Sequence, residues 1–183
     1  MEYNPIIENK DIKLRRVRSF DVENLFEAVT ESLTELSIWM PWCTKDYSIK
    51  ESELWCESRE DAWNKKEAYD FFIIDKCDES LIGVCGINNI NTDARFANLG
   101  YWIRTSRTGK GIATAVVPML ARFGFKNLNL NRMEIVVAEG NLASQRVAEK
   151  SGALREGLLR QRLFIHEKSV DAFMFPIIPT DFI

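Results

Sequence analysis

The stretch RTSRTGKGIATA, residues 104–115, places two glycines one residue apart at the start of a segment with helical periodicity. Arg104, Arg107 and Lys110 add three cationic side chains, and no acidic residue occurs from position 104 to 120. Glycine allows backbone amides to approach a ligand closely, and the first turn of a helix leaves amide donors without partners. The stretch therefore predicts an anion-binding turn suited to a pyrophosphate.

Three interpretations of this turn compete. A P-loop needs a hydroxyl residue directly after its lysine, whereas Gly111 follows Lys110, and position 104 holds arginine where the first P-loop glycine belongs. A dinucleotide-binding turn needs a third glycine where this chain has Thr114. The third interpretation is a glycine-rich turn that only starts a helix. Two glycines with this cationic flank are more than such a turn requires.

The apolar periodicity divides the chain into elements whose order predicts the fold class. Strands are expected at residues 12–17, 69–75, 80–90, 95–104, 133–138, 154–164 and 169–175. Helices are expected at about 19–40, 48–63, 112–123 and 141–152. Three consecutive strands separated by turn formers indicate an antiparallel meander, and a strand–helix–strand unit follows. This order favours one α+β domain with a mixed sheet.

Composition excludes several classes of protein. The 183 residues carry 24 Lys and Arg against 27 Asp and Glu, so the net charge of −3 gives no basic surface for nucleic acid. The beginning of the chain is too polar for a secretory signal, and no apolar run reaches the roughly 20 residues that span a bilayer. We therefore expect a cytoplasmic protein with no direct nucleic-acid partner and no membrane segment.

The cysteines and the histidine do not suggest a metal site. Cys43, Cys56, Cys77 and Cys85 show no C-x-x-C spacing, and His166 is the one histidine. A structural zinc site needs four well-spaced ligands, so no metal is expected. Free thiols in a reducing compartment are the expected state.

Residues 99–157, from LGYWIRTSRTGKG to EKSGALREG, resemble the cofactor half of the GNAT superfamily of acetyl-CoA-dependent N-acetyltransferases. The pyrophosphate motif of that superfamily, Q/R-x-x-G-x-G/A, corresponds to residues 106–111, with Ser106 departing at the first position. A second motif, N-x-x-S followed by a helix and S/N-G, corresponds to Asn141 and Ser144 with Ser151 and Gly152. The chain most closely resembles the branch that acetylates the N-terminal alanine or serine of ribosomal proteins.

This resemblance implies a largely antiparallel central sheet of about seven strands flanked by about four helices. It implies a single domain over residues 1–183, with an acceptor-side half of about 1–94 and an acetyl-CoA-binding half of about 95–183. The implied co-substrate is acetyl-CoA, with no metal. The implied cofactor-binding residues are Ile103, Arg104, Arg107, Thr108, Gly109, Lys110, Gly111, Ile112, Ala113, Thr114, Asn141 and Ser144.

In this superfamily the amine attacks the acetyl thioester directly. The resemblance implies that main-chain amides of residues 107–113 hold the pyrophosphate and that Asn141 hydrogen-bonds the pantetheine chain. Ser144 is expected to donate to the departing sulfur, although its hydroxyl is equally consistent with helix capping. Oligomeric state stays open between monomer and homodimer.

The residue that acts as base is not determined by the sequence. Related enzymes often carry an acidic residue where this chain has Asn98, which could hold a relaying water, and Glu139 is the nearest alternative carboxylate in the sequence. An α-amino group is about 10% neutral at pH 7, whereas a lysine is below about 0.1% neutral, so an α-amine tolerates a weak base better. A protein N-terminus or a small-molecule amine is therefore the expected acceptor.

The acceptor pocket is expected to come from the N-terminal half and the strand before the turn. Its candidate walls are Trp39, Trp42, Tyr101 and Trp102, each of which core packing alone would also explain. Glu31, Glu35 and Asp46 are candidates for attracting a cationic acceptor, or else solvated surface charges. Two other functions stay open: acetylation of a polyamine or an aminoglycoside-like amine, and a catalytically silent acyl-CoA-binding domain.

Overall fold

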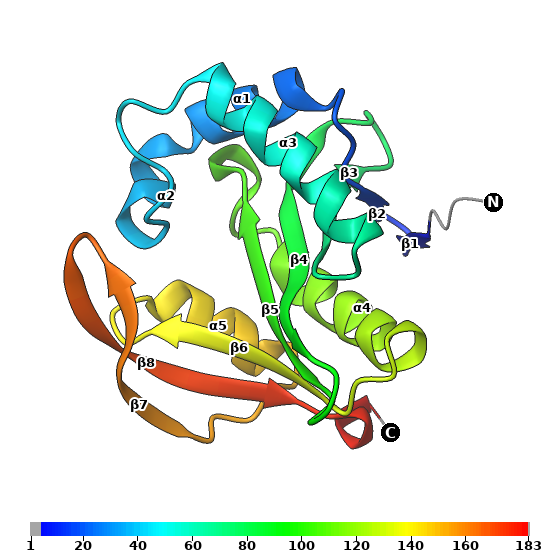
Figure 1. Ribbon diagram of the computed structural model, residues 1–183, viewed down its shortest axis with the longest axis vertical. Coiled ribbons are helices and arrows are strands. Elements are labelled where there is room, and N and C mark those ends of the chain that lie inside the picture. The colour runs from blue at the N-terminus through cyan, green and yellow to red at the C-terminus, as the bar shows by residue number, and fades with distance from the viewer. Residues whose placement is uncertain (1–4, 183) are drawn as a thin grey trace.

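A computed structural model describes residues 5–182, which form an eight-stranded sheet in the order β1-β2-β3-β4-β5-β6-β8-β7 (Figure 1). The strands are β1 (Ile6–Glu8), β2 (Ile12–Arg16), β3 (Tyr69–Asp75), β4 (Leu81–Asn91), β5 (Phe96–Ile103), β6 (Arg132–Ala138), β7 (Gly157–Ile165) and β8 (Lys168–Ile177). Within the described residues, β5 and β6 form the one parallel pair, and the other neighbours run antiparallel. The expected mixed, largely antiparallel sheet is confirmed.

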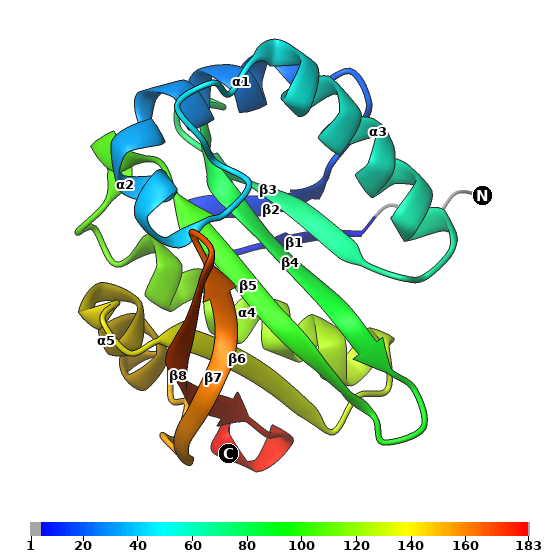
Figure 2. The same cartoon turned by 60° about the vertical axis from the view of Figure 1, so that its left-hand side comes forward.

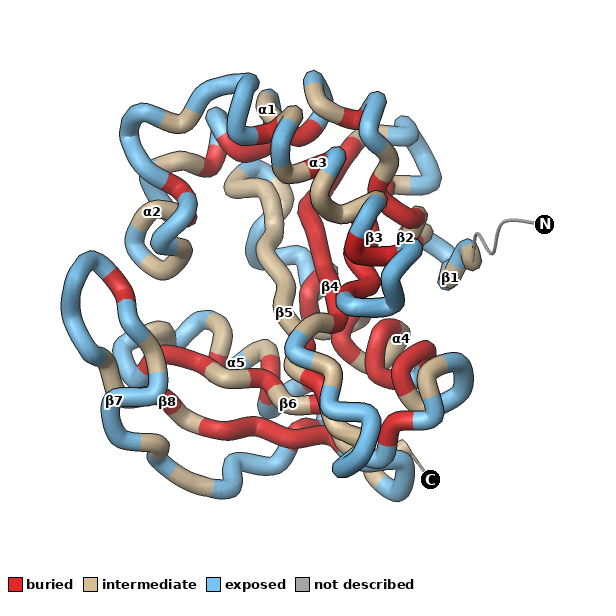
Figure 3. Tube along the Cα trace, viewed as in Figure 1, coloured by how far each residue is buried: buried red, intermediate tan, exposed pale blue. Residues whose placement is uncertain are grey.

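Helices cover both faces of the sheet (Figure 2). They are α1 (Val22–Glu31), α2 (Leu33–Trp39), α3 (Ile49–Asn64), α4 (Ile112–Asn127) and α5 (Leu142–Lys150), with two short 3₁₀ turns at Thr105–Arg107 and Pro179–Phe182. One apolar core joins α4 and α5 to the sheet, and a second joins α1 and α2 to the other face of β3 and β4. Strands β3 and β4 are therefore buried on both faces, as Figure 3 shows, which explains why their sequences are almost continuously apolar.

The connection through α4 determines where the sheet opens. Helix α4 carries the chain from β5 to the parallel strand β6, and these strands pair only between Phe96–Asn98 and Arg132–Glu134. Beyond that point β5 stays paired with β4 and β6 stays paired with β8. The carboxyl-terminal parts of β5 and β6 therefore diverge, and Figure 1 shows the resulting V-shaped opening.

The described residues carry one strand and one helix more than the expected about seven and about four. The additional strand is β1, whose three residues are too few to show a periodicity and pair with β2. The additional helix arises because the first expected helix is divided at Ser32 into α1 and α2. The side chain of Ser32 is fully buried, and its hydroxyl accepts a hydrogen bond from the amide of Thr105 at 3.0 Å.

Within the described residues no helix is both long and apolar enough to cross a membrane. Over the same residues, no group of three or more His, Cys, Asp or Glu side chains is arranged to hold a metal ion.

Candidate active site

The turn before α4 has the backbone that its glycines predict. Gly109 and Gly111 adopt left-handed φ angles of 73° and 75°, and Gly111 is the N-cap of α4 without a side-chain capping bond. A Cβ atom at either position would meet nothing within 4 Å, so conformation rather than crowding requires glycine. Residues 112–114 form the first helical turn, whose amides have no intrahelical acceptor. These donors border open space and carry the partial positive charge of the helix start.

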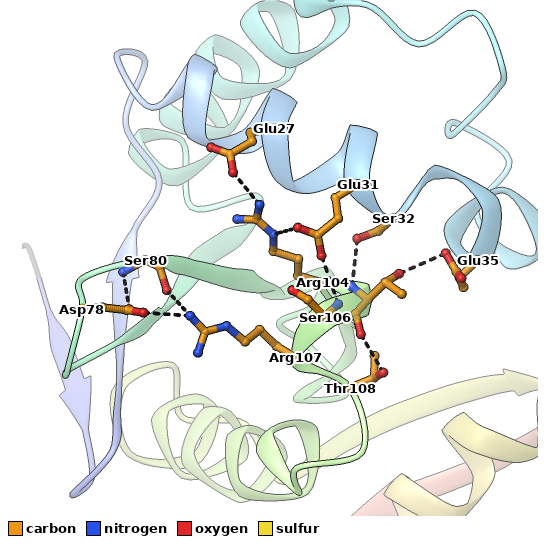
Figure 4. A network of polar contacts seen from close by, with 11 residues as sticks. Glu27, Glu31, Ser32, Glu35, Asp78, Ser80, Arg104, Ser106, Arg107 and Thr108 are labelled. Carbon is orange, nitrogen blue, oxygen red and sulfur yellow. Dashed lines mark hydrogen bonds and ion pairs between the residues drawn. The ribbon is translucent and has the colours of Figure 1, made fainter.

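Two arginines of the turn are already paired with carboxylates (Figure 4). Arg104, just after Ile103 ends β5, contacts Glu27 and Glu31 from α1. Arg107 contacts Asp75 and Asp78 at 3.0 and 2.8 Å and donates to the hydroxyl of Ser80 at 3.0 Å. The cationic charge that the sequence suggests for a phosphate is thus largely neutralised at these positions. Their predicted role as cofactor contacts stays a prediction.

The turn is also fastened to the junction between α1 and α2. The amide of Ser106 donates to Glu31 at 3.0 Å, and the hydroxyl of Thr105 donates to Glu35 at 3.0 Å (Figure 4). Hydrogen bonds from Ser106, and the neighbouring Arg104, lower the pKa of the Glu31 carboxyl to about 2. Glu31 and Glu35 therefore hold the turn, and neither lines the cavities described below.

A cavity of about 220 Å³ lies at the opening between β5 and β6. It is lined by Trp39, Met40, Pro41, Leu99, Gly100, Tyr101, Ile135, Val136, Val137, Ala138, Asn141, Ser144, Leu163, Phe164 and Ile165. Gly100 and Tyr101 face residues 135–138 without a ladder between them, because the β5–β6 pairing ends at Asn98. Backbone donors and acceptors along this opening suit an extended ligand that carries amide groups.

Tyr101 and Ser144 form the polar centre of this smaller cavity. The two hydroxyl oxygens are 3.0 Å apart, and the Tyr101 hydroxyl also lies 3.3 Å from the main-chain oxygen of Ser144. Burial raises the pKa of Tyr101 to about 12, so its hydroxyl stays protonated at neutral pH. Asn141 caps α5, because its side-chain oxygen accepts a hydrogen bond from the amide of Ser144 at 3.0 Å, and it also lines the cavity. The sequence had suggested Tyr101 only as a wall.

A larger cavity of about 530 Å³ lies on the face of the sheet that α1 and α3 cover. It is lined by Leu25, Val29, Met40, Trp42, Tyr47, Glu51, Leu54, Trp55, Ser58, Arg59, Asp70, Val84, Cys85, Gly86, Asn88, Gly100, Tyr101 and Trp102. The rings of Trp42 and Trp102 lie 6.5 Å apart in its wall. Met40, Gly100 and Tyr101 line both cavities, so the two cavities are neighbours beside this part of β5.

Four expected wall residues thus border cavities, whereas the two expected base candidates do not. Trp39 lines the smaller cavity, Trp42 and Trp102 line the larger one, and Tyr101 lines both. The Asn98 amide instead donates to Asn88 at 3.0 Å. The Glu139 side chain is exposed at the end of β6 and lines neither cavity.

Sequence reasoning missed Asp70, a carboxylate in the larger cavity. Asp70 lies on β3 and is 8% exposed, and its Oδ2 is 3.4 Å from Nη1 of Arg59 on α3. Burial raises the pKa of Asp70 to about 6, and Arg59 opposes this shift. The signal was one ionisable residue, Asp70, within the otherwise apolar run YDFFII (residues 69–74) of β3, because a buried acid needs a partner or a function.

Comparisons with known proteins give a consistent result. A family model described as an acetyltransferase (GNAT) domain matches residues 11–154. The Bacillus subtilis (strain 168) protein named "Putative ribosomal N-acetyltransferase YdaF" is 30% identical over 173 residues, which cover 93% of this chain and 92% of that protein. The "Spermidine N(1)-acetyltransferase" of Vibrio cholerae is 28% identical over 55% of this chain and 58% of that protein.

The solved structure of "a putative ribosomal-protein-serine acetyltransferase from Vibrio cholerae" superposes with a TM-score of 0.84 at 29% identity. That match covers 97% of this chain and 98% of the other. The region that matches the family model includes the α4 turn, Asp70, Tyr101 and Ser144.

Proposed function

The chain belongs to the GNAT family of N-acetyltransferases, which use acetyl-CoA, and we propose that its acceptor is the α-amino group at a polypeptide N-terminus. The observation that carries this choice is the match to a relative named as a ribosomal N-acetyltransferase over nearly the whole of both chains. The pKa of an α-amine, about 8, supports the choice, because such an amine needs less help to lose its proton than lysine does.

The α4 turn fits the diphosphate of the co-substrate. Main-chain amides of residues 109–113 would hold it, since the left-handed glycines leave open space above these donors. The side-chain NH₂ of Asn141 would donate to the amide-bearing arm that enters between β5 and β6. Arg104 and Arg107 would shape the turn through their ion pairs rather than bind phosphate directly.

In this proposal the two reactants would occupy the two neighbouring cavities, which share Gly100 and Tyr101 of β5 as lining residues. The acceptor amine would enter the larger cavity between Trp42 and Trp102 and meet the thioester near Gly100 and Tyr101. The nitrogen attacks the acetyl carbon directly, and the carbon–sulfur bond breaks. The hydrogen-bonded pair Tyr101 and Ser144 supplies a proton to the departing sulfur, because both hydroxyls are protonated at neutral pH.

A panel of amines tests the acceptor. Thiol release from acetyl-CoA is measured with a peptide that begins with serine or alanine, with the same peptide blocked at its N-terminus and carrying an internal lysine, and with spermidine. We expect kcat/KM for the free α-amine to exceed the other two by about tenfold or more. Equal rates with the blocked peptide would refute an α-amine acceptor.

A polyamine is the second candidate acceptor, since the chain also resembles a spermidine N(1)-acetyltransferase over about half its length. The acidic side chains of Glu51 and Asp70 in the larger cavity would suit a polycation. A higher kcat/KM for spermidine than for either peptide would favour this candidate.

A further inference from the structure

Asp70 lies in a row of residues that crosses three strands. In the ladder, Asp70 of β3 pairs with Gly86 of β4, and Gly86 pairs with Gly100 of β5. Adjacent strands are about 4.8 Å apart, so the Cα atoms of Asp70 and Gly100 are separated by about 10 Å. Because Gly86 and Gly100 have no side chains, the sheet surface beside Asp70 is uncovered on β4 and β5.

The Asp70 carboxylate uses the space that Gly86 leaves. A Cβ atom on Gly86 would lie 2.1 Å from Oδ1 of Asp70, so the carboxylate extends over β4 toward β5. A Cβ atom on Gly100 would meet only the Asn98 amide, at 3.9 Å. The row therefore forms a shallow floor, with a carboxylate at one end and the strand shared by both cavities at the other.

Asp70 has weak pairing for a buried acid. Within residues 5–182 its carboxylate has one hydrogen-bonding partner, Nη1 of Arg59, at the long distance of 3.4 Å. The other ionisable groups of this cavity are Glu51 on α3, Cys85 on β4, and the hydroxyls of Tyr47 and Tyr101. A structural ion pair at this depth would be expected to show short, bidentate contacts. This carboxylate retains the capacity to accept from a ligand.

From this geometry we propose that Asp70 binds the amino group of the acceptor and removes the proton that the nitrogen loses on acetylation. This inference rests on the proposed function and deepens it by naming the base. The new bond joins the amine nitrogen to the acetyl carbon, and the carbon–sulfur bond breaks with its electron pair on sulfur. One proton passes from nitrogen to Asp70, directly or through one water, and the sulfur receives one from the Tyr101–Ser144 pair.

The acidity of Asp70 suits this role. Its pKa of about 6 leaves Asp70 ionised at pH 7. This pKa is also closer to the pKa of an amine than the pKa of an exposed aspartate is, which favours proton transfer. Arg59, whose Nη1 is 3.4 Å from Oδ2, favours the ionised form of the carboxylate. The attacking species is the neutral amine, which makes up about 10% of an α-amine of pKa about 8 at pH 7 and below about 0.1% of a lysine. The inference therefore agrees with an α-amine acceptor.

The test substitutes Asp70→Asn, which keeps the shape and removes the charge. With the serine or alanine peptide at pH 7.5, we expect kcat/KM to fall about 100-fold or more, with CoA affinity within about twofold of wild type. Below about pH 6 the ratio of wild-type to variant kcat/KM should fall about tenfold per pH unit, because wild-type Asp70 becomes protonated. A merely structural role would give a ratio that does not change with pH.

Asp21→Asn is the matched control. Asp21 is a buried acid that is paired with Arg15, and Asp21 lines neither cavity. It should keep kcat/KM within about twofold of wild type. If Asp70→Asn does not fold, Asp70→Ala with added formate replaces it, and restored turnover is expected. A variant that keeps its activity, or a ratio independent of pH, would overturn the inference. The acceptor proposed above is tested separately, by the amine preference of the wild-type enzyme.

Discussion

The α4 turn and the larger cavity differ in the groups that they would offer to a ligand. The turn is a contiguous stretch whose donors are main-chain amides, and Arg104 and Arg107 are engaged by carboxylates. The cavity is built from side chains of α1, α3, β3, β4, β5 and the segment after α2. A ligand site made of main-chain amides depends on backbone φ angles and little on side-chain identity. A ligand site made of side chains depends on which residues the sheet register brings together.

The largest expected effect tests the backbone side of this comparison. Gly111→Asp places a carboxylate on the open face of the turn, where it repels a diphosphate by about 3 kcal/mol, or about 100-fold in CoA affinity. Isothermal titration with CoA measures this loss. Gly152→Asp is the control, because Gly152 has a left-handed φ of 92° and equally open surroundings at the end of α5. Unchanged CoA affinity in Gly111→Asp would place the diphosphate elsewhere.

The second prediction tests the side chains of the larger cavity. Gly86→Ala forces a methyl group against Oδ1 of Asp70, so the carboxylate must turn away from β5. We expect kcat/KM for the amine to fall about tenfold while CoA affinity stays within about twofold. Combining Gly86→Ala with Asp70→Asn should cost little more than Asp70→Asn alone, because both changes act on one carboxylate. Fully additive losses would contradict that coupling.

A smaller effect distinguishes the cations of the turn. Among residues 5–182, Lys110 has no ion pair, whereas Arg107 is held by two aspartates. Lys110→Gln should weaken CoA binding about three- to fivefold at low salt, an effect that shrinks as ionic strength rises. Arg107→Gln should change affinity less than Lys110→Gln and lower the melting temperature more. The reverse order in a titration would show that Arg107 leaves its partners to bind phosphate.

The smallest expected effect concerns Glu31, which links α1 to the turn before α4. The folded-state pKa of Glu31, about 2, lies below its ordinary value of 4.5, so its ionised form stabilises the fold above pH 4.5. This contribution is lost as the pH falls from 4.5 toward 2. Because Glu31 is exposed, solvent screening limits the effect of Glu31→Gln at pH 7 to about 0.5 kcal/mol. Urea unfolding should show the difference at pH 7 and little of it near pH 2.

The sequence predicts most of the fold because its elements have clear periodicity. The division at Ser32 was missed because it involves the amide of Thr105, a tertiary contact across 73 residues. Strand β1 was missed because three residues carry no pattern.

The site was predictable to the extent that it is local. Gly109 and Gly111 reveal the turn because neighbouring residues create it. The Tyr101–Ser144 contact depends on how α5 packs beside β5, and the environment of Asp70 depends on its register with Gly86. Neither contact leaves a local sequence pattern, although the single acid in the apolar run YDFFII marks Asp70 itself.

A crystal structure with CoA and an N-terminally acetylated peptide tests the central claim most directly. We expect a diphosphate bound by the amides of residues 109–113, a sulfur beside Tyr101 and Ser144, and a peptide nitrogen facing Asp70. A diphosphate bound away from the α4 turn, or a peptide outside the larger cavity, would contradict it.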